Sequence, residues 1–265
     1  MAIEEFELCI KPQTDIVIWR YMDLAKFEAL LKNKALFFCR ADRFSDPFEG
    51  SIPQKEAKYR IVERKRLSSY YSVEFEERKA KESIGEISKL HIKLKKQYIV
   101  NCWHINNVEN DSMWQLYLKS NDGVAIKSTV KSLLRSFENT KEIIYCSKVR
   151  YLDYEKDIWY HKTDYPNMAY NLFTPIVHKR IEFQQEQELR LIHELDNSND
   201  PDEYWKNQQF KNGKNILIDP NILIHQVYCA PTSDEEQKKR ILELIVKYGL
   251  SFEVERSRLS DEPYY

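Results

Sequence analysis

The amino-acid sequence predicts an α+β fold built on a mixed, mostly antiparallel sheet. Short β-branched and aromatic runs, which are typical of strands, outnumber what a doubly wound sheet needs, and helical segments fall between them irregularly. Only 5 glycines occur in 265 residues, which excludes glycine-rich phosphate loops and ordinary dinucleotide-binding turns. Because the chain has no internal repeat and no Pro/Gly/Ser-rich linker, we expect a single domain over residues 1–265.

The first half of the chain is predicted to alternate strands with capped helices. Asp23 precedes a segment with an apolar face, which predicts a helix over residues 23–33. Asn110 or Asp111 is expected to cap a short helix that is apolar on most sides and therefore buried. Strands are predicted over residues 16–21, 35–39, 97–103 and 123–127.

The second half is predicted to contain more strands than helices. Helices are expected over residues 129–137 and in a segment that ends at His178. Ser233 and Glu236 have the spacing of a capping box for the last helix, and Gly249 is placed to end it. Strands are predicted over residues 142–152, 187–193, 216–218, 224–229 and 251–255.

Residues 53–96 differ in composition from the rest of the chain. They carry 13 basic side chains against 7 acidic ones, a surplus of six positive charges. Their pattern predicts a charged helical insert made of two helices. The insert is either a solvated part of the surface or a basic arm that binds a phosphate-bearing partner such as nucleic acid. In the second case Tyr59, Tyr70 and Tyr71 could stack on bases.

The whole-chain composition excludes several classes of protein. With 42% hydrophobic and 31% charged residues the chain is not intrinsically disordered, and its net charge of -1 gives no global attraction to nucleic acid or anionic membranes. No apolar run approaches the ~18 residues of a membrane span, so we expect no membrane association. The cysteines are odd in number and scattered, which indicates reduced thiols in a cytoplasmic protein. They are Cys9, Cys39, Cys102, Cys146 and Cys229.

The predicted strand at residues 187–193 contains an unusual charged face. Alternation places two leucines on one face, while Glu186, Glu188 and Arg190 share the other. Such a face is either solvated and salt-bridged, or it lines a cleft in which Arg190 holds one carboxylate in place. In a cleft, the carboxylate pair could orient a hydroxyl, stabilise a cationic sugar transition state or bind a metal ion.

Arg20 and Asp46 are further candidates. Arg20 shares a strand face with Ile16 and Ile18, so its guanidinium ends an apolar stripe and needs a partner. It either forms an ion pair with Asp46 or a strand glutamate, or it clamps an anion such as phosphate or pyrophosphate. Asp46 lies in the turn-rich loop 42–49, which is either a structural plug or one wall of a site.

Two other segments carry reactive or aromatic side chains. Cys102 and His104 share a strand face, either as a nucleophile pair or as a buried thiol beside an ordinary histidine. Trp114 and Tyr117 pack in the core or form a ring wall for a nucleobase or nicotinamide. The six histidines show no metal-ligand spacing, so we expect no metal site.

Several motifs occur in an order that resembles one family. Over about Ile18 to Leu259 the chain is similar to the prokaryotic domain of unknown function catalogued as family 2971. Its hallmarks are an (Asn/Ser)-Asp-Pro-Phe-Glu loop, a Cys-(Trp/Phe) strand, a Met-Trp-x-x-Tyr helix before a Gly-containing strand, and a late Glu-x-Glu-x-Arg strand. Ser45 stands where Asn is commoner. The matching segments are Ser45-Asp46-Pro47-Phe48-Glu49, Cys102-Trp103, Met113-Trp114-Gln115-Leu116-Tyr117, Gly123-Val124-Ala125-Ile126 and Glu186-Gln187-Glu188-Leu189-Arg190.

The layout of this family is in turn similar to ADP-ribosyltransferase-like folds. These begin with a strand that bears Arg or His and end with a strand that bears a catalytic Glu. The resemblance implies that Arg20 holds the pyrophosphate of NAD, that Glu188 stabilises the oxocarbenium at the nicotinamide ribose, and that Glu186 orients the acceptor. The Ser-Thr-Ser strand of those folds is missing, so Trp114 or Tyr117 would supply the stacking surface. The implied supporting residues are Arg190, Asp46 and Cys102.

The implied activity is modification of a macromolecule, such as nucleic acid, in defence against phage or rival cells. Two alternatives remain open from the residues themselves. Glu188-Leu189-Arg190 is close to the Glu-x-Lys strand of metal-dependent nucleases, and Asp157 or Asp164 could complete a metal site. A non-catalytic sensor or adaptor would instead bind nucleic acid or protein through residues 53–96.

Overall fold

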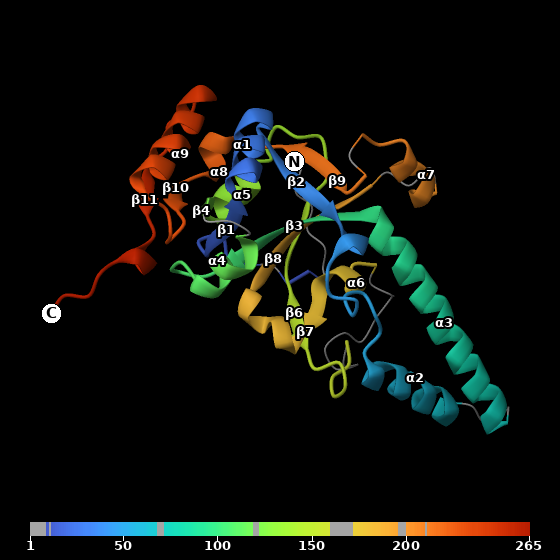
Figure 1. Cartoon of the computed structure of the whole chain (residues 1–265). Helices are drawn as coiled ribbons and strands as arrows, with labels where there is room; N and C mark the ends of the chain where they lie inside the picture. The colour runs from blue at the N-terminus through green and yellow to red at the C-terminus, as the bar shows by residue number, and fades with distance from the viewer. Residues whose placement is uncertain are drawn as a thin grey trace.

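The computed structural model describes residues 9–10, 12–67, 72–118, 122–159, 172–195, 200–209 and 211–265. Within these residues the centre of the molecule is a nine-stranded sheet of order β11-β10-β4-β1-β3-β2-β9, with β8 beside β3 and β5 beside β8 (Figure 1). Its strands are β1 Val17–Asp23, β2 Ala35–Arg40, β3 Tyr98–Ile105, β4 Gly123–Thr129, β5 Tyr145–Lys148, β8 Glu188–Glu194, β9 Gly213–Leu217, β10 Gln226–Cys229 and β11 Val254–Arg256.

A second, two-stranded sheet lies against the main one. It pairs β6 (Arg150–Leu152) with β7 (His178–Arg180) in parallel. In the main sheet only β10 and β11 pair in parallel among the described strands. The helices are α1 Leu24–Asn33, α2 Gln54–Leu67, α3 Val73–Gln97, α4 Asp111–Tyr117, α5 Val130–Arg135, α6 Thr174–Val177, α7 Pro201–Lys206, α8 Pro220–Leu223 and α9 Glu235–Lys247. The α+β fold with a mixed, mostly antiparallel sheet is therefore confirmed.

The central strand β3 pairs with one strand along one edge and with two different strands along the other edge. Along the first edge it pairs with β8 over its length, from Tyr98 to His104. Along the second edge, its end pairs with β1 and its beginning with β2, which leaves Asn101–Trp103 between the two. Side chains fill this fork, because Asn101 Nδ2 donates to the Phe37 carbonyl at 2.9 Å and Arg20 Nη1 donates to the Cys102 carbonyl at 2.5 Å.

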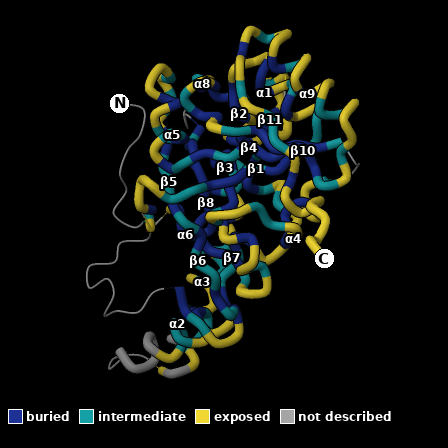
Figure 2. The backbone as a smooth tube through the Cα atoms, turned by 90° about the vertical axis from the view of Figure 1, so that its left-hand side faces the viewer, coloured by how far each residue is buried: buried dark blue, intermediate teal, exposed yellow. Residues whose placement is uncertain are grey.

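The two faces of β8 have different roles. Leu189 and Leu191 are fully buried in the main hydrophobic core, which confirms the predicted alternation. Glu188 and Arg190 lie on the opposite face, across from His104 and Cys102 of β3. Figure 2 shows that this region of the sheet is largely buried. Burying charged groups is costly, so these side chains must find partners inside the protein.

The predicted cap of the first helix is confirmed, whereas the predicted cap of the last helix is displaced by one residue. Asp23 caps α1 through a bond from Lys26 N–H to its carboxylate, as predicted. The capping box of α9 is formed by Asp234 and Gln237, one residue later than predicted, because the Ser233 N–H already donates to a turn carbonyl. The positive φ of 70° at Gly249 ends α9 as expected.

Three other predictions were wrong in detail. The predicted long strand 142–152 divides at Val149 into β5 and β6, which belong to different sheets. The helix that was expected to reach His178 ends at Val177, because His178 already pairs in β7. The helix α4 is not buried on most sides, since only Met113 and Trp114 face the core while Leu116 is 55% exposed.

Residues 53–96 contain the helices α2 and α3. Figure 1 shows α3 extending away from the sheet, with α2 beside its distant half. Many of their charges pair along the helix surface, for example Lys81 with Glu77 and Lys89 with Glu86. Such exposed pairs contribute little to stability. Tyr70 and Tyr71 lie outside the described residues. In the described part of the chain, no helix has the length and apolar character to cross a membrane.

Candidate functional site

A cluster of buried charges occupies the polar face of β8. Lys179 Nζ lies 2.9 Å from Glu186 Oε2, 2.7 Å from Glu188 Oε1 and 3.5 Å from Glu49 Oε1. Arg190 donates from Nε to Glu188 Oε2 at 2.8 Å and from Nη2 to Glu49 Oε2 at 2.9 Å. Three carboxylates thus share two cations inside the protein, an arrangement that satisfies each charged group.

Local backbone structure brings these residues together. Lys179 comes from β7, and a 3-10 helix over Ile181–Glu186 turns the chain back toward β8. Gln187 then adopts the left-handed conformation with φ 38°, and the strand begins at Glu188. Glu186 is therefore not on the strand, which corrects the prediction that it shares a strand face with Glu188. The two carboxylates still meet, because both contact Lys179.

The loop before α2 supplies Glu49. Asp46 anchors this loop through a bidentate ion pair with Arg180, at 2.9 and 3.0 Å, and Arg180 also stacks on Phe48 at 4.3 Å. The backbone N–H of Phe48 donates to Asp46 Oδ1 at 3.0 Å, which closes the predicted turn. Asp46 therefore pairs with Arg180 and not with Arg20, and its position supports the cluster through the loop.

Two of the three glutamates in the cluster, Glu186 and Glu188, have opposite protonation tendencies. Burial alone would raise the pKa of Glu188, but Arg190 and Lys179 outweigh burial and hold this pKa well below its usual range. Burial and the nearby Glu188 carboxylate raise the pKa of Glu186, although Lys179 opposes them. In such a pair, the group with the raised pKa can take part in acid–base catalysis while the group with the lowered pKa remains a fixed negative charge.

A small cavity of about 20 Å³ adjoins this cluster. This volume is close to that of one ordered water molecule. Residues from β1, β3, α4 and the β8 region converge on it. The predicted site residues among its lining are Arg20, Cys102, Tyr117, Glu186 and Glu188. The fold therefore brings together residues from both ends of the chain that the sequence had singled out.

Arg20 enters this cavity from the fork in the sheet. Its guanidinium donates to the Cys102 carbonyl and lies 5.8 Å from the centre of the Trp103 ring. Among the described residues no carboxylate lies within ion-pair distance of it, so neither predicted ion pair, with Asp46 or a strand glutamate, is formed. Burial lowers the pKa of Arg20, and an arginine remains charged even so. A partly buried cation that has no carboxylate partner among the described residues can receive an anionic ligand.

The sequence left two interpretations of His104 open, as half of a nucleophile pair with Cys102 or as an ordinary histidine beside a buried thiol. His104 is 5% exposed and lines the same cavity. Its Nδ1 lies 2.7 Å from the Glu186 carbonyl, while its Nε2 is buried without a hydrogen-bond partner in the described part of the protein. Burial raises the pKa of the Cys102 thiol well above its ordinary value, so Cys102 is a poor nucleophile.

Helix α4 covers the cavity. Met113 and Tyr117 line the cavity. Tyr117 is 38% exposed as a whole, but loss of water around its hydroxyl raises its pKa above the usual range, so the hydroxyl stays protonated. Trp114 does not line the cavity. Its ring packs against Tyr21, with ring centres 4.9 Å apart, and its Nε1 donates to Glu109 Oε2 at 3.1 Å.

Sequence reasoning missed Lys179, named Glu49 only as the end of a loop motif, and did not place His104 beside the glutamates. Lys179 lies in a three-residue strand and Glu49 in a loop, and neither segment has a periodic pattern that marks an inward-facing charge. His104 could have been found, because its alternation with Cys102 places it on the face across from Glu188. Only the pairing of β3 with β8 shows that this face is the charged one.

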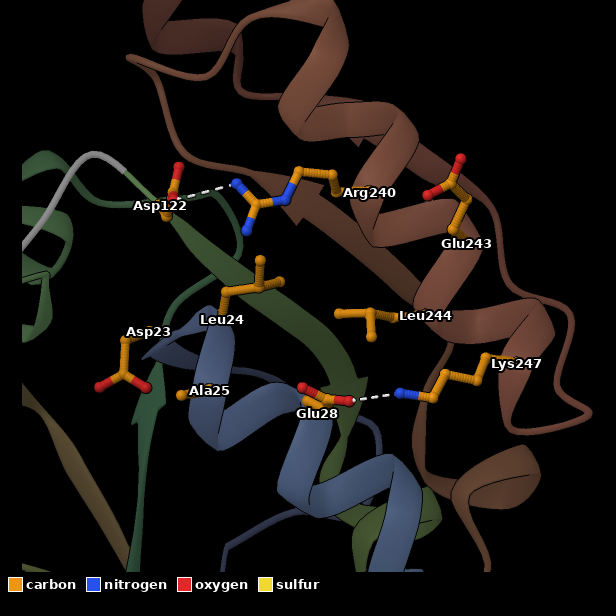
Figure 3. Close-up of a pocket in the computed structure, with 9 residues that line it drawn as sticks. All are labelled: Asp23, Leu24, Ala25, Glu28, Asp122, Arg240, Glu243, Leu244 and Lys247. Atoms are coloured by element: carbon orange, nitrogen blue, oxygen red, sulfur yellow. Dashed lines mark hydrogen bonds and ion pairs between the residues drawn. The ribbon is translucent and has the colours of Figure 1, made fainter.

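A larger groove of about 520 Å³ separates α1 from α9 (Figure 3). Its charged side chains pair across it, Lys247 with Glu28 at 2.9 Å and Arg240 with Asp122 at 3.5 Å. These exposed pairs are sufficient to explain the charges that line the groove. The candidate site is therefore the smaller cavity.

The structure also bears on metal binding. The described residues contain no group of three His, Cys, Asp or Glu side chains placed to hold a metal ion. Asp157, which was considered for a nuclease site, accepts a hydrogen bond from the Asp153 N–H at 2.9 Å. Asp164 lies outside the described residues. Lys179 and Arg190 already occupy the oxygens of Glu188.

Fold and site together define an α+β protein with a buried carboxylate cluster beside Arg20, which has no carboxylate partner among the described residues. Residues 113–191 match the model of a family described as protein of unknown function (DUF2971). The match runs from α4 to β8 and so includes Tyr117, Glu186 and Glu188. It supports the resemblance noted in the sequence. No curated protein matches the chain.

Proposed function

We propose that the protein is an ADP-ribosyltransferase-like enzyme that uses NAD to modify a macromolecule. One observation carries the proposal: Arg20, which pairs with no carboxylate in the part of the chain that the structure describes, lines the same cavity as Glu186 and Glu188. An enzyme of this kind needs a cation for the pyrophosphate of NAD and a carboxylate beside the ribose carbon where the bond to nicotinamide breaks. The residue types that line the cavity supply both.

The protonation tendencies of the two glutamates support separate roles. Glu188 remains ionised because Arg190 and Lys179 lower its pKa, so it offers a fixed negative charge to a developing oxocarbenium. Glu186 has a raised pKa and one oxygen that Lys179 does not contact, so it can orient the acceptor. When bound, NAD would contribute the glycosidic bond that is cleaved. Tyr117 provides a ring on the α4 side of the cavity.

The present cavity is too small for this substrate. A volume of about 20 Å³ contrasts with the ~300 Å³ or more of a typical small-molecule site. The side chains fit the chemistry, but NAD would have to enter while α4 is displaced from the sheet. Glu109 opposes that displacement, because it accepts hydrogen bonds from Trp114 of α4 and from Ser257 near the C-terminus. Access to the site would therefore depend on the release of Glu109.

Nucleic acid is the acceptor that the charge distribution favours. A groove of about 550 Å³ between α3 and α7 is lined by Lys89, Lys93 and Lys96 and also by Asp200 and Asp202. Lys89 pairs with Glu86, and Lys96 pairs with Asp202. Lys93 forms no ion pair with the described residues, so its charge is available to a phosphate. Modification of nucleic acid fits the defence setting, against phage or rival cells, that the family resemblance implies.

The test is transfer of label from radiolabelled NAD into a lysate that is then separated into protein, DNA and RNA. Wild type is compared with Glu188→Gln and Arg20→Lys, and the exposed Glu236→Gln is the matched control. We expect transfer by wild type and Glu236→Gln. We expect a loss of at least ~100-fold in the two site variants, provided that each is folded. Equal transfer by Glu188→Gln, or no transfer by folded wild type in any fraction, would overturn the proposal.

A further inference from the structure

His104 is held in one defined orientation inside the cavity. Its Nδ1 lies 2.7 Å from the Glu186 backbone carbonyl, and a carbonyl oxygen can only accept a hydrogen bond. Nδ1 therefore carries the proton, and Nε2 presents a lone pair. This contact is the usual way in which a protein selects one tautomer of a neutral imidazole.

Nε2 belongs to a side chain that lines the cavity. His104 lies between Glu188 of β8 and Trp19 of β1 in the sheet, and the edge of the Tyr21 ring lies beside it with centres 6.3 Å apart. Nε2 is buried and accepts no hydrogen bond from the described residues. A buried acceptor without a partner is costly, which is a reason to expect a hydrogen-bond donor in this cavity.

The other groups around the cavity are less suited to accept a proton. Glu188 accepts three hydrogen bonds from Lys179 and Arg190, and Glu186 contacts Lys179. Burial raises the pKa values of the Cys102 thiol and the Tyr117 hydroxyl, so both keep their protons. Arg20 cannot act as a base. Burial also lowers the pKa of His104, which keeps its imidazole neutral near pH 7.

We propose that His104 is the general base for the acceptor in the reaction, and that the acceptor is consequently a neutral group, a hydroxyl or a nucleobase N–H. The inference rests on the proposed function. In the step, the acceptor atom bonds to the anomeric carbon while the bond from that carbon to nicotinamide breaks, and nicotinamide leaves with the electron pair. The acceptor proton passes to His104 Nε2. Glu188 and Glu186, which line the same cavity, then stabilise the imidazolium.

The experiment uses the full chain and the acceptor fraction that wild type labels. His104→Gln is expected to lower kcat for transfer by ~10²- to 10⁴-fold while the KM for NAD changes little. A structural role alone would alter KM and stability and leave the pH profile unchanged. Wild-type kcat/KM should therefore fall at low pH along a limb with an apparent pKa below the ~6.5 of an ordinary histidine, and this limb should be absent in the variant.

The outcomes separate the two proposals. If wild type transfers label and folded His104→Gln transfers it equally with the same pH profile, His104 is not the base while the transferase function stands. If wild type transfers nothing, both proposals fail together. If His104→Gln does not fold, His104→Asn and the wild-type pH profile are used to test whether His104 is the base. A wild-type kcat/KM without an acidic limb over the whole pH range in which the protein stays folded would then exclude a histidine base.

Discussion

Lys179 contacts both Glu186 and Glu188, but the two glutamates have different electrostatic surroundings. Its Nζ is 2.7 Å from Glu188 and 2.9 Å from Glu186, but only Glu188 is also held by Arg190. The additional cation lowers the pKa of Glu188, while burial and the Glu188 charge raise that of Glu186. Two adjacent carboxyl groups therefore contribute to folding stability with opposite dependence on pH.

The first prediction concerns stability at pH 7. Glu188→Gln is expected to cost ~3–5 kcal/mol, because it removes the central anion from a buried ion cluster and leaves Lys179 and Arg190 undercompensated. Glu186→Gln is expected to cost clearly less, because the ionised form of Glu186 is already disfavoured by burial. Urea unfolding measures both variants. Equal losses would show that the two carboxylates share one electrostatic environment.

The second prediction is the pH dependence of these differences. A lowered folded-state pKa at Glu188 stabilises the protein above the ~4.3 of an unfolded glutamate, and this stabilisation is lost as the pH falls through the folded value. The cost of Glu188→Gln should therefore shrink toward acid. The raised pKa of Glu186 has the opposite sign, so wild type should gain stability from this group as the pH falls through that raised value. Unfolding curves between pH 3 and 7 test both signs.

The sequence predicted the strands and helices around this site better than the side-chain contacts within it. Alternation in β8 and the capping of α1 depend on neighbouring residues, and both are visible in the sequence. The contacts of Lys179 depend on the pairing of β6 with β7, two strands of three residues that have no periodic pattern. The left-handed conformation of Gln187 is equally hidden, because nothing in a glutamine side chain favours φ 38°. Tertiary contacts alone decide these features.

The third prediction concerns the loop that carries Glu49. Asp46→Asn should cost ~1.5–3 kcal/mol, since it removes a charge-assisted bidentate pair whose carboxylate is 2% exposed. The control is Glu138→Gln, which removes an exposed partner of Arg135 and should change stability by less than ~0.5 kcal/mol. If both substitutions had equally small effects in thermal unfolding, the loop would not depend on its pair with Arg180.

The fourth prediction compares two glycines. A Cβ at Gly213 would lie 2.1 Å from the Phe38 carbonyl oxygen, a backbone atom that cannot move without breaking the β2–β9 pairing. Gly213→Ala is therefore expected to be strongly destabilising. A Cβ at Gly85 in α3 meets no atom within 4 Å, so Gly85→Ala should stabilise by ~0.5–1 kcal/mol through helix propensity. Chemical denaturation of both variants measures the contrast. A neutral Gly213→Ala would contradict the close packing of β9 on β2.

The last prediction tests whether Glu109 controls access to the cavity. Its carboxylate accepts hydrogen bonds from Trp114 of α4, from Ser257 and from the Arg258 backbone N–H. Glu109→Gln should weaken this attachment by roughly the 1.5–3 kcal/mol of a charged hydrogen bond, and so raise the opening of α4 about 10- to 100-fold. Cys102 lines the cavity, so its rate of labelling by a thiol reagent reports the opening.

Cys229 supplies the internal control, because it is 1% exposed in β10 and does not line the cavity. Peptide mapping by mass spectrometry would follow both thiols in the same sample. We expect faster labelling of Cys102 in Glu109→Gln and an unchanged rate at Cys229, whereas parallel acceleration of both would indicate general destabilisation. If the rate at Cys102 does not change, α4 is not held by Glu109. Entry of a nucleotide would then require another movement, because a cavity of about 20 Å³ admits nothing larger than water.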